Sequence, residues 1–195
     1  GTLGIADRDT VSLSNIHRQS LYNEKDINQS KVKIAKKKLN KINSKTKINI
    51  FNLKLNKTTF EKIIKNYDYI VDGTDNFESK FLINDLSLKY KKFLVTGAIS
   101  KFDGHIFTFN FTNKKDPCLR CFYQEETISD EILNCEYEGI LGTVAGTIGT
   151  LQANEVLKKI LNIGQNLNGY ILILDLLNLN FRKAKINKRK KCLCN

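Results

Sequence analysis

Residues 69–76 read Tyr69-Ile70-Val71-Asp72-Gly73-Thr74-Asp75-Asn76. The apolar residues that open this stretch predict a buried strand ending near Asp72, and the polar residues after it predict a loop. A helix is expected next, from about Phe77 to Tyr90. A buried strand that leads through a polar loop into a helix is the repeating unit of an α/β protein with a parallel sheet.

The sequence before this stretch shows the same alternation. From Lys31 to Ile42 the apolar positions recur at steps of three and four with lysines between them, which predicts a helix with one buried face. A strand is expected around Ile48 to Leu53, and a short helix around Phe60 to Ile64. Strands and helices in alternation favour a parallel sheet.

The second half of the chain predicts antiparallel strands at the end of this sheet. A strand is expected from Phe93 to Thr96, just before Gly97, and Asp103-Gly104 predicts a hairpin turn. After that turn, residues 107–111 alternate between aromatic and polar side chains, as in a strand with one buried face. The remaining predicted elements are a helix from Gly142 to about Leu161, with small residues on one side, and strands at 170–174 and 179–186.

The composition fits one globular domain without a membrane segment. The 195 residues are 41% hydrophobic, and no apolar run approaches the roughly 18 to 20 residues that span a bilayer. The net charge of +12 raises the question of nucleic acid, but lysine is abundant along the whole chain and does not mark one binding stripe. The chain contains no Met and opens inside an apolar strand, so we expect its natural N-terminus to be missing.

Four of the five cysteines form two close pairs, Cys118-x-x-Cys121 and Cys192-x-Cys194, and Cys135 stands alone between them. Two close pairs far apart in sequence fit a tetrahedral thiolate metal site better than a disulfide framework in a chain of this size. Reduced thiolates favour a reducing compartment such as the cytosol.

Residues typical of a nucleotide site follow the first predicted strand. Asp7 stands at the end of that strand, where an acidic side chain can accept hydrogen bonds from ribose hydroxyls. Asn15, Arg18 and Lys31 come soon after it, and cations of this kind bind phosphate oxygens. Two plainer interpretations stay open, because Asp7 could be a solvated loop carboxylate and Lys31 a solvated lysine at the start of a helix.

Asp75 lies just beyond the strand at 69–72, at the edge where parallel sheets bind ligands. A carboxylate there can hold Mg²⁺ against the phosphates of a nucleotide, and the metal would offset charge on a pyrophosphate leaving group. The alternative is that Asp75 caps the helix that begins near Phe77.

Four blocks of sequence stand out together. They are Asp7-Arg8-Asp9-Thr10-Val11-Ser12-Leu13-Ser14-Asn15-Ile16-His17-Arg18-Gln19, Lys31-Val32, Thr74-Asp75-Asn76 and Gly149-Thr150-Leu151-Gln152-Ala153. In these blocks, and over essentially all 195 residues, the chain resembles the MoeB/ThiF/HesA family, which is related to the ubiquitin-activating enzymes. The resemblance implies a Rossmann-like, mostly parallel sheet with helices on both faces that continues into antiparallel strands.

The resemblance also implies an activity and a set of site residues. An adenylyltransferase of this kind would use ATP to adenylylate the C-terminal glycine of a ubiquitin-like sulfur-carrier protein of the molybdopterin or thiamine type. Asp7 would contact the ribose, Asn15, Arg18 and Lys31 the phosphates, and Asp75 a Mg²⁺ ion. The cysteine pairs would hold a structural Zn²⁺ ion, with the ligands Cys118, Cys121, Cys192 and Cys194.

The chain departs from the family pattern at both ends. The domain at residues 1–195 lacks the Gly-rich phosphate loop and the N-terminal arm that the family places before this sequence. Its last cysteine pair is Cys-x-Cys, where the family usually has Cys-x-x-Cys. Cys135 matches a family position where some members carry a cysteine that takes part in sulfur transfer or acyl capture, and the plainer interpretation is a thiol without a role.

The resemblance implies a cytoplasmic homodimer, in a bacterial cytosol or an organellar stroma, served by a sulfur donor such as a cysteine desulfurase or a rhodanese. Two other classes are compatible with the sequence. The first is an NAD-dependent oxidoreductase on the same kind of sheet, which leaves Arg18, Lys31, Asp75 and the cysteine pairs unexplained. The second is a zinc-stabilised binding module without catalytic activity, which the missing phosphate loop keeps open.

Overall fold

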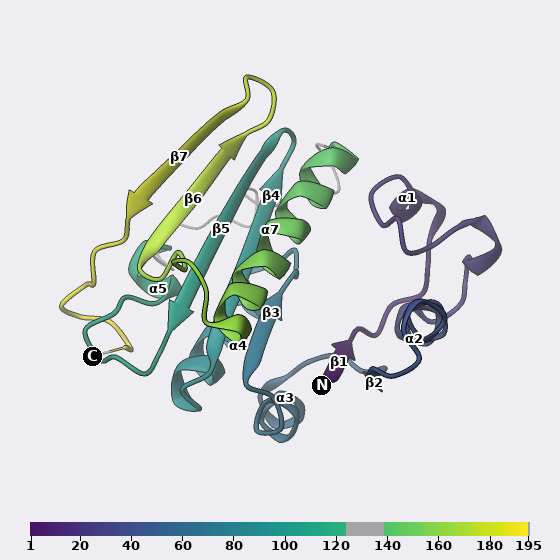
Figure 1. The fold of residues 1–195 in the computed structure, drawn as a ribbon, viewed down its shortest axis with the longest axis horizontal. Helices are drawn as coiled ribbons and strands as arrows, with labels where there is room; N and C mark the ends of the chain where they lie inside the picture. The colour runs from purple at the N-terminus through teal and green to yellow at the C-terminus, as the bar shows by residue number, and fades with distance from the viewer. Residues whose placement is uncertain (124–138, 195) are drawn as a thin grey trace. The chain divides into compact units, whose positions relative to one another are not determined.

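The computed structural model describes residues 1–123 and 139–194. These residues form two compact units, Gly1–Asn56 and Lys57–Asn195, and each unit has its own sheet and helices (Figure 1).

The first unit packs one helix against a pair of parallel strands. Its elements are β1 (Thr2–Ala6), α1 (Leu13–Ile16), the short 3₁₀ helix η1 (Glu24–Asp26), α2 (Lys31–Ile42) and β2 (Lys47–Phe51). Strands β1 and β2 are parallel neighbours, with Leu3 opposite Ile48. Helix α2 buries Val32 and Ala35 as its apolar spacing predicted, whereas Ile42 at its last position is exposed.

The second unit contains a sheet whose strand order is β3-β4-β5-β6-β7. Its elements are α3 (Lys57–Ile64), β3 (Tyr69–Asp72), α4 (Phe77–Lys89), β4 (Phe93–Ser100), β5 (Asp103–Asn110), α5 (Leu119–Phe122), α7 (Gly142–Leu161), β6 (Tyr170–Asp175) and β7 (Asn180–Lys185). Strands β3 and β4 are parallel, and the pairings from β4 to β7 are antiparallel. The prediction of a parallel sheet that continues into antiparallel strands is therefore confirmed.

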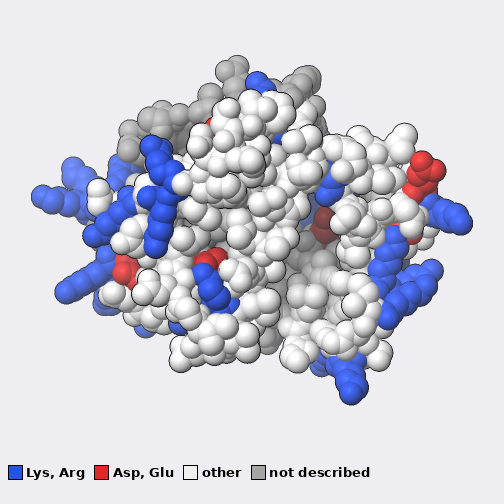
Figure 2. All heavy atoms as spheres, turned by 45° about the horizontal axis from the view of Figure 1, so that its top comes forward, with Lys and Arg blue, Asp and Glu red and all other residues white. Residues whose placement is uncertain are grey.

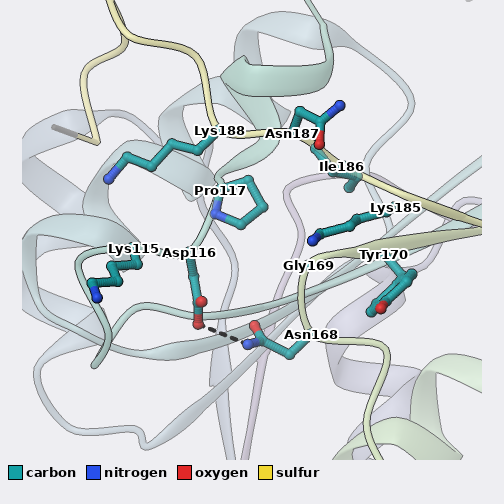
Figure 3. A pocket seen from close by; sticks show the side chains of 10 residues that line it. All are labelled: Lys115, Asp116, Pro117, Asn168, Gly169, Tyr170, Lys185, Ile186, Asn187 and Lys188. Carbon is teal, nitrogen blue, oxygen red and sulfur yellow. Dashed lines mark hydrogen bonds between the residues drawn. The ribbon is translucent and has the colours of Figure 1, made fainter.

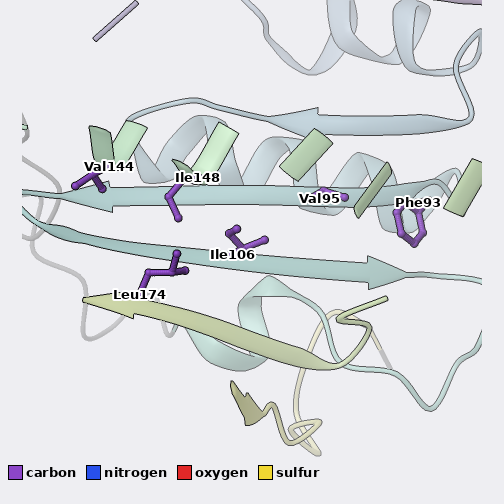
Figure 4. Close-up of a cluster of buried hydrophobic side chains, with 6 residues drawn as sticks. All are labelled: Phe93, Val95, Ile106, Val144, Ile148 and Leu174. Carbon is purple, nitrogen blue, oxygen red and sulfur yellow. The ribbon is translucent and has the colours of Figure 1, made fainter. Parts of the chain in front are cut away.

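The long helix α7 covers one face of this sheet, and α4 lies on the opposite face (Figure 1). The side chains of Phe93, Val95 and Ile106 point to the α7 face, where they pack with Val144 and Ile148 (Figure 4). Successive side chains of a strand point to opposite faces, so the residues between these positions on β4 and β5 face the other way, toward α4 and α5. The hydroxyl of Thr96 on β4 contacts Asp72, which is paired with Lys80 of α4, whereas Thr108 on β5 faces α7 and donates to Glu155.

The predicted hairpin turn at Asp103-Gly104 is wrong by two residues. Ser100 pairs with Asp103, so the turn consists of Lys101 and Phe102, and Lys101 has a positive φ of 39°. Gly104 instead lies within β5, where an added Cβ atom would come within 2.4 Å of Cδ1 of Ile148. A glycine is needed there because α7 approaches the strand closely, not because the chain turns.

Lys and Arg side chains are spread over the visible surface in Figure 2 and outnumber Asp and Glu, in keeping with the net charge of +12. Within residues 1–123 and 139–194, no helix combines the length and the apolar character needed to cross a bilayer.

Candidate nucleotide and metal sites

In the first unit, Asp7 directly follows β1, at the C-terminal end of a parallel strand. Its backbone N–H donates to the carbonyl of Phe51 at the end of β2, at 3.2 Å. Its Oδ1 atom accepts a hydrogen bond from the backbone N–H of Asp9 at 2.8 Å. The side chain is therefore held in a turn at the strand end and remains partly exposed, which fits a contact with ribose hydroxyls.

Asn15 and Arg18 lie in and just after the short helix α1. The Nη1 atom of Arg18 donates to the carbonyl of Ser14 at 2.8 Å and lies 2.8 Å from Nε2 of His17. These contacts leave Arg18 half exposed. A guanidinium has five N–H donors, and two of them can donate parallel hydrogen bonds to two oxygens of one phosphate.

Lys31 is not the solvated lysine that its place at the start of a helix allows. It is 7% exposed, and its Nζ atom lies 3.3 Å from Oδ2 of Asp9. Its backbone N–H also donates to the carbonyl of Asp9, at 3.0 Å. The structure thus brings Lys31 and Asp7 to the same residue, Asp9, which the sequence alone did not single out as their common partner.

Tyr22 is a further residue of this region that the sequence did not reveal. Its hydroxyl donates to the carbonyl of Lys31 at 3.2 Å. Burial, together with the charges of Asp7 and Asp26, raises the pKa of Tyr22 to about 12. Tyr22 therefore stays protonated and keeps this hydrogen bond to the first residue of α2 throughout the physiological pH range.

In the second unit, Asp75 lies in the loop after β3 and is exposed. The capping alternative for Asp75 is wrong, because the side chain of Asn76 caps α4 by accepting from the N–H of Ser79 at 2.8 Å. The carboxylate of Asp75 accepts one hydrogen bond from the amide of Asn76 at 3.2 Å. An exposed carboxylate at the C-terminal end of a parallel strand fits a Mg²⁺ ligand, since Mg²⁺ in nucleotide sites takes one or two carboxylates and the phosphates.

The four paired cysteines form one cluster in the second unit. Their sulfur atoms all lie within 4.8 Å of one another. The sulfurs of Cys118 and Cys121 each lie 3.5 Å from the sulfur of Cys192, and the sulfur of Cys121 also lies 3.5 Å from that of Cys194. A tetrahedral Zn²⁺ site with bonds of about 2.3 Å places its sulfurs about 3.8 Å apart, so these four fit such an ion.

The local chain explains how the cysteines meet. Cys118 stands at the N-cap of α5, and the backbone N–H of Cys121 donates to its carbonyl at 2.9 Å, so one tight turn presents both sulfurs. Burial and the neighbouring sulfurs raise the pKa of Cys118, and burial raises the pKa of Cys194 to about 12. A bound cation would reverse this tendency, because a metal ion favours deprotonated thiol ligands.

Lys188 lies beside the cluster, in a pocket of about 320 Å³ (Figure 3). Its ammonium donates to the carbonyl of Cys194 at 2.9 Å and also to the carbonyl of Lys114. Asn168 and Asp116 line the same pocket, and the side-chain amide of Asn168 donates to Asp116 at 2.7 Å. The ammonium therefore joins the two chain segments that carry the cysteines.

Cys135 lies outside the described residues, so its role stays a prediction. Asp7, Asn15, Arg18 and Lys31 belong to the first unit and Asp75 to the second. Asp7 directly follows β1 and Asp75 lies in the loop after β3, so each unit places one carboxylate just beyond the C-terminal end of a parallel strand.

The fold and these residues define a class of protein. It is an α/β protein with a group of four cysteines that can hold a metal ion. The ThiF family matches the chain over residues 1–195, and the chain belongs to this family. The resemblance to the MoeB/ThiF/HesA family is confirmed.

Several relatives carry adenylyltransferase names. The chain is 39% identical over 184 residues to a probable molybdopterin-synthase adenylyltransferase of Gracilaria tenuistipitata var. liui, covering 94% of the chain and 51% of that protein. It is 33% identical over 195 residues to a sulfur carrier protein adenylyltransferase of Thermus thermophilus, covering 98% and 72%. It is 37% identical over 196 residues to the adenylyltransferase and sulfurtransferase MOCS3 of Dictyostelium discoideum, covering 100% and 45%. The chain thus spans about half the length of the first and third of these relatives.

Among solved structures, E. coli MccB with ATP superposes with a TM-score of 0.83 at 18% sequence identity, covering 100% of this chain and 59% of MccB. This likeness shows the fold.

Proposed function

We propose that this chain is the ThiF-type domain of an enzyme that uses ATP to adenylylate the C-terminal glycine of a ubiquitin-like sulfur-carrier protein. The observation that carries the proposal is the family match over the whole chain, together with relatives named for this activity. The carboxylates of Asp7 and Asp75 just beyond two strands and the cations Arg18 and Lys31 support it, because a nucleotide requires groups of these kinds.

In this reaction a carboxylate oxygen of the carrier's terminal glycine attacks the α-phosphorus of ATP. A new P–O bond forms as the bond from the α-phosphorus to the bridging oxygen breaks, which yields an acyl-adenylate and pyrophosphate. Positioning and charge stabilisation supply most of the acceleration in such a transfer. A Mg²⁺ ion held by Asp75 would neutralise charge on the departing pyrophosphate.

The chain's own residues would divide this work. Asp7 would accept hydrogen bonds from the ribose, and Asn15 and Arg18 would hold phosphate oxygens. The ammonium of Lys31, now paired with Asp9, would exchange part of that contact for a phosphate oxygen. A lysine that is buried and already paired is held in place before the nucleotide arrives, which lowers the entropy lost on binding.

Three further roles complete the proposal. The four-cysteine cluster would hold a structural Zn²⁺, since all four coordination positions are filled by sulfur.

A homodimer would use the exposed small residues of α7, Gly146, Gly149 and Ala153, for close packing. After adenylylation, a sulfur donor would convert the adenylate to a thiocarboxylate in the cytoplasm or an organellar stroma, and Cys135 would act, if at all, at that later step.

Exchange of pyrophosphate into ATP that depends on a carrier protein tests the proposal in the full-length protein. Asp75→Asn and Arg18→Ala should each lower the exchange rate about a hundredfold to a thousandfold, because each removes a charge that stabilises the transition state. The matched controls are Asp68→Asn, at the opposite end of β3, and Arg182→Ala on β7, both exposed. Wild-type exchange in Asp75→Asn and Arg18→Ala would exclude these residues from the mechanism.

A further inference from the structure

The carboxylate of Asp72, the last residue of β3, is surrounded by hydrogen-bond donors. Its Oδ1 atom accepts from the backbone N–H of Thr74 at 2.8 Å and from the hydroxyl of Thr74 at 2.7 Å. Its Oδ2 atom accepts from the ammonium of Lys80 at 3.1 Å and from the hydroxyl of Thr96. The side chains of Asp72 and Lys80 are 0% and 2% exposed, so water has no access to this ion pair.

The same strand end is anchored on both faces of the sheet. Lys80 lies on α4 and donates a second hydrogen bond to the carbonyl of Gly97 on β4. From the opposite face, the side-chain amide of Gln152 on α7 donates to the backbone carbonyl of Asp72 at 2.8 Å. Three elements therefore fix the position of Asp72, and its carboxylate cannot move without breaking several contacts.

A buried ion pair of this kind needs an explanation other than stability. Removing two charges from water costs several kcal/mol per ion, and well-packed apolar side chains often give equal or greater stability. What the carboxylate of Asp72 adds is control of Thr74, which donates both hydrogen bonds to Oδ1 and directly precedes Asp75. Thr74 thus holds the loop after β3 in place, while the carboxylate of Asp75 remains exposed.

We infer that Asp72, with its counter-ion Lys80, is a positioning residue that fixes the loop of Thr74 and thereby aims the carboxylate of Asp75 at the metal and the phosphates. The inference rests on the proposed function, because it assigns Asp75 to the Mg²⁺ ion of the nucleotide. It adds an outer layer to that site, of the kind that orients metal ligands in proteins. Asp72 itself touches neither metal nor substrate in this arrangement.

The test is to weaken the contact between Asp72 and Thr74 without breaking the buried ion pair. Asp72→Asn would leave the ammonium of Lys80 beside a neutral amide and risks unfolding, so Thr74→Val is the sharper change. It removes one hydroxyl donor and keeps the backbone N–H contact. Thr74→Ser is the conservative variant, because serine keeps the hydroxyl donor and lacks only the methyl group. The matched control is Thr108→Val, which removes a buried hydroxyl that donates to another carboxylate, Glu155, at 2.9 Å.

The measurement is the dissociation constant of Mn²⁺ from the complex of the full-length protein with ATP, by electron paramagnetic resonance, beside the thermal unfolding midpoint. Thr74→Val should weaken Mn²⁺ binding about tenfold, and Thr74→Ser should restore it. Thr108→Val should lower the unfolding midpoint and leave Mn²⁺ binding unchanged. If Thr74→Val and Thr108→Val lose Mn²⁺ affinity equally, the contact between Thr74 and Asp72 serves only the stability of the fold. That result would overturn the inference.

Asp75→Asn separates this inference from the proposed function. If Asp75→Asn abolishes Mn²⁺ binding and Thr74→Val has no effect, the metal assignment stands and the positioning role of Asp72 is wrong. If Asp75→Asn also leaves Mn²⁺ binding unchanged, Asp75 is not the metal ligand, and both the assignment and the positioning role fall.

Discussion

The ammonium of Lys188 donates a hydrogen bond to the carbonyl oxygen of Cys194 at 2.9 Å. The same ammonium also bonds to the carbonyl of Lys114, in the segment that leads to Cys118. One side chain therefore ties the short terminal cysteine pair to the other half of the cluster. It also places a positive charge at the backbone of Cys194, whose side chain must be a thiolate when it binds a metal.

Loss of this contact should loosen the metal site. Lys188→Met is expected to speed the transfer of Zn²⁺ to a coloured chelator by about tenfold, because outer contacts of this kind contribute that much to metal affinity. Lys185→Met is the matched control, since Lys185 lines the same pocket and carries the same charge (Figure 3). Equal transfer rates in the two variants would show that general charge, and not the contact with Cys194, matters.

The protein should carry one zinc ion per chain when purified without added metal. Elemental analysis measures this directly, and a metal content near zero in folded protein would contradict the assignment. Cys194→Ser should lower the zinc content, because its sulfur lies 3.5 Å from that of Cys121 and completes the set of four. Zinc retained in full by Cys194→Ser would show that the short pair binds through Cys192 alone.

Gly104→Ala should destabilise the second unit by about 1 to 3 kcal/mol, because the new methyl group overlaps Ile148 in a packed core. The double variant with Ile148→Ala should lose less than the sum of the two single losses, since the overlapping atoms are then absent. Urea unfolding of all three variants provides the free energies, and additive losses would refute the proposed overlap.

Glu155 makes the stability of the second unit depend on acid pH. Burial acts to raise its pKa, but an ion pair with Lys158 and hydrogen bonds from Leu167, Asn166 and Thr108 outweigh burial and lower the pKa below its ordinary value of 4.5. A carboxylate whose pKa is lower in the folded state contributes stability above its unfolded pKa and loses it as the pH falls through the folded pKa.

Glu155→Gln should therefore reduce the free energy of unfolding at pH 7 by about 1 to 3 kcal/mol. The difference from the parent should shrink as the pH falls below the ordinary value of 4.5. Urea unfolding at pH 7 and at several values below that point measures it. A difference that stays constant over this range would mean that the charge of Glu155 contributes nothing.

Cys135→Ala should leave the exchange of pyrophosphate into ATP nearly intact. Adenylate formation depends on phosphate contacts, and the neighbouring Glu136 and Glu138 oppose a thiolate at this position. If Cys135 acts at all, the variant should be impaired in thiocarboxylate formation. Loss of exchange would contradict the assignment, and normal thiocarboxylate formation would leave Cys135 an unused thiol.

The periodic elements of the fold were predictable from sequence because their signals are local. The apolar spacing of α2, the strand at Tyr69–Asp72 and the two cysteine pairs each depend on residues close together in the chain. Gly104 was misread because its neighbour Ile148 belongs to another element, and a glycine beside Asp103 resembles a turn.

The polar contacts of the candidate sites were less accessible to sequence. The ion pair of Lys80 with Asp72 depends on how a helix packs against a strand, and that of Lys31 with Asp9 on how a helix meets the loop after a strand. A lysine inside a predicted helix gives no sign that it is buried, particularly in a chain with 32 Lys and Arg residues.

The way α7 meets the sheet limits where this chain can change its length. Gln152 reaches the carbonyl of Asp72, and Glu155 reaches Thr108, so two polar side chains one turn apart each have a single partner on the sheet. Sliding the helix by one residue would turn these groups away from their partners. It would also replace Val144 and Ile148 on the apolar core by threonines or by smaller residues. Insertions and deletions that arise between β5 and α7 must therefore be accommodated before Leu141, whose N–H is already bonded to the carbonyl of Lys101.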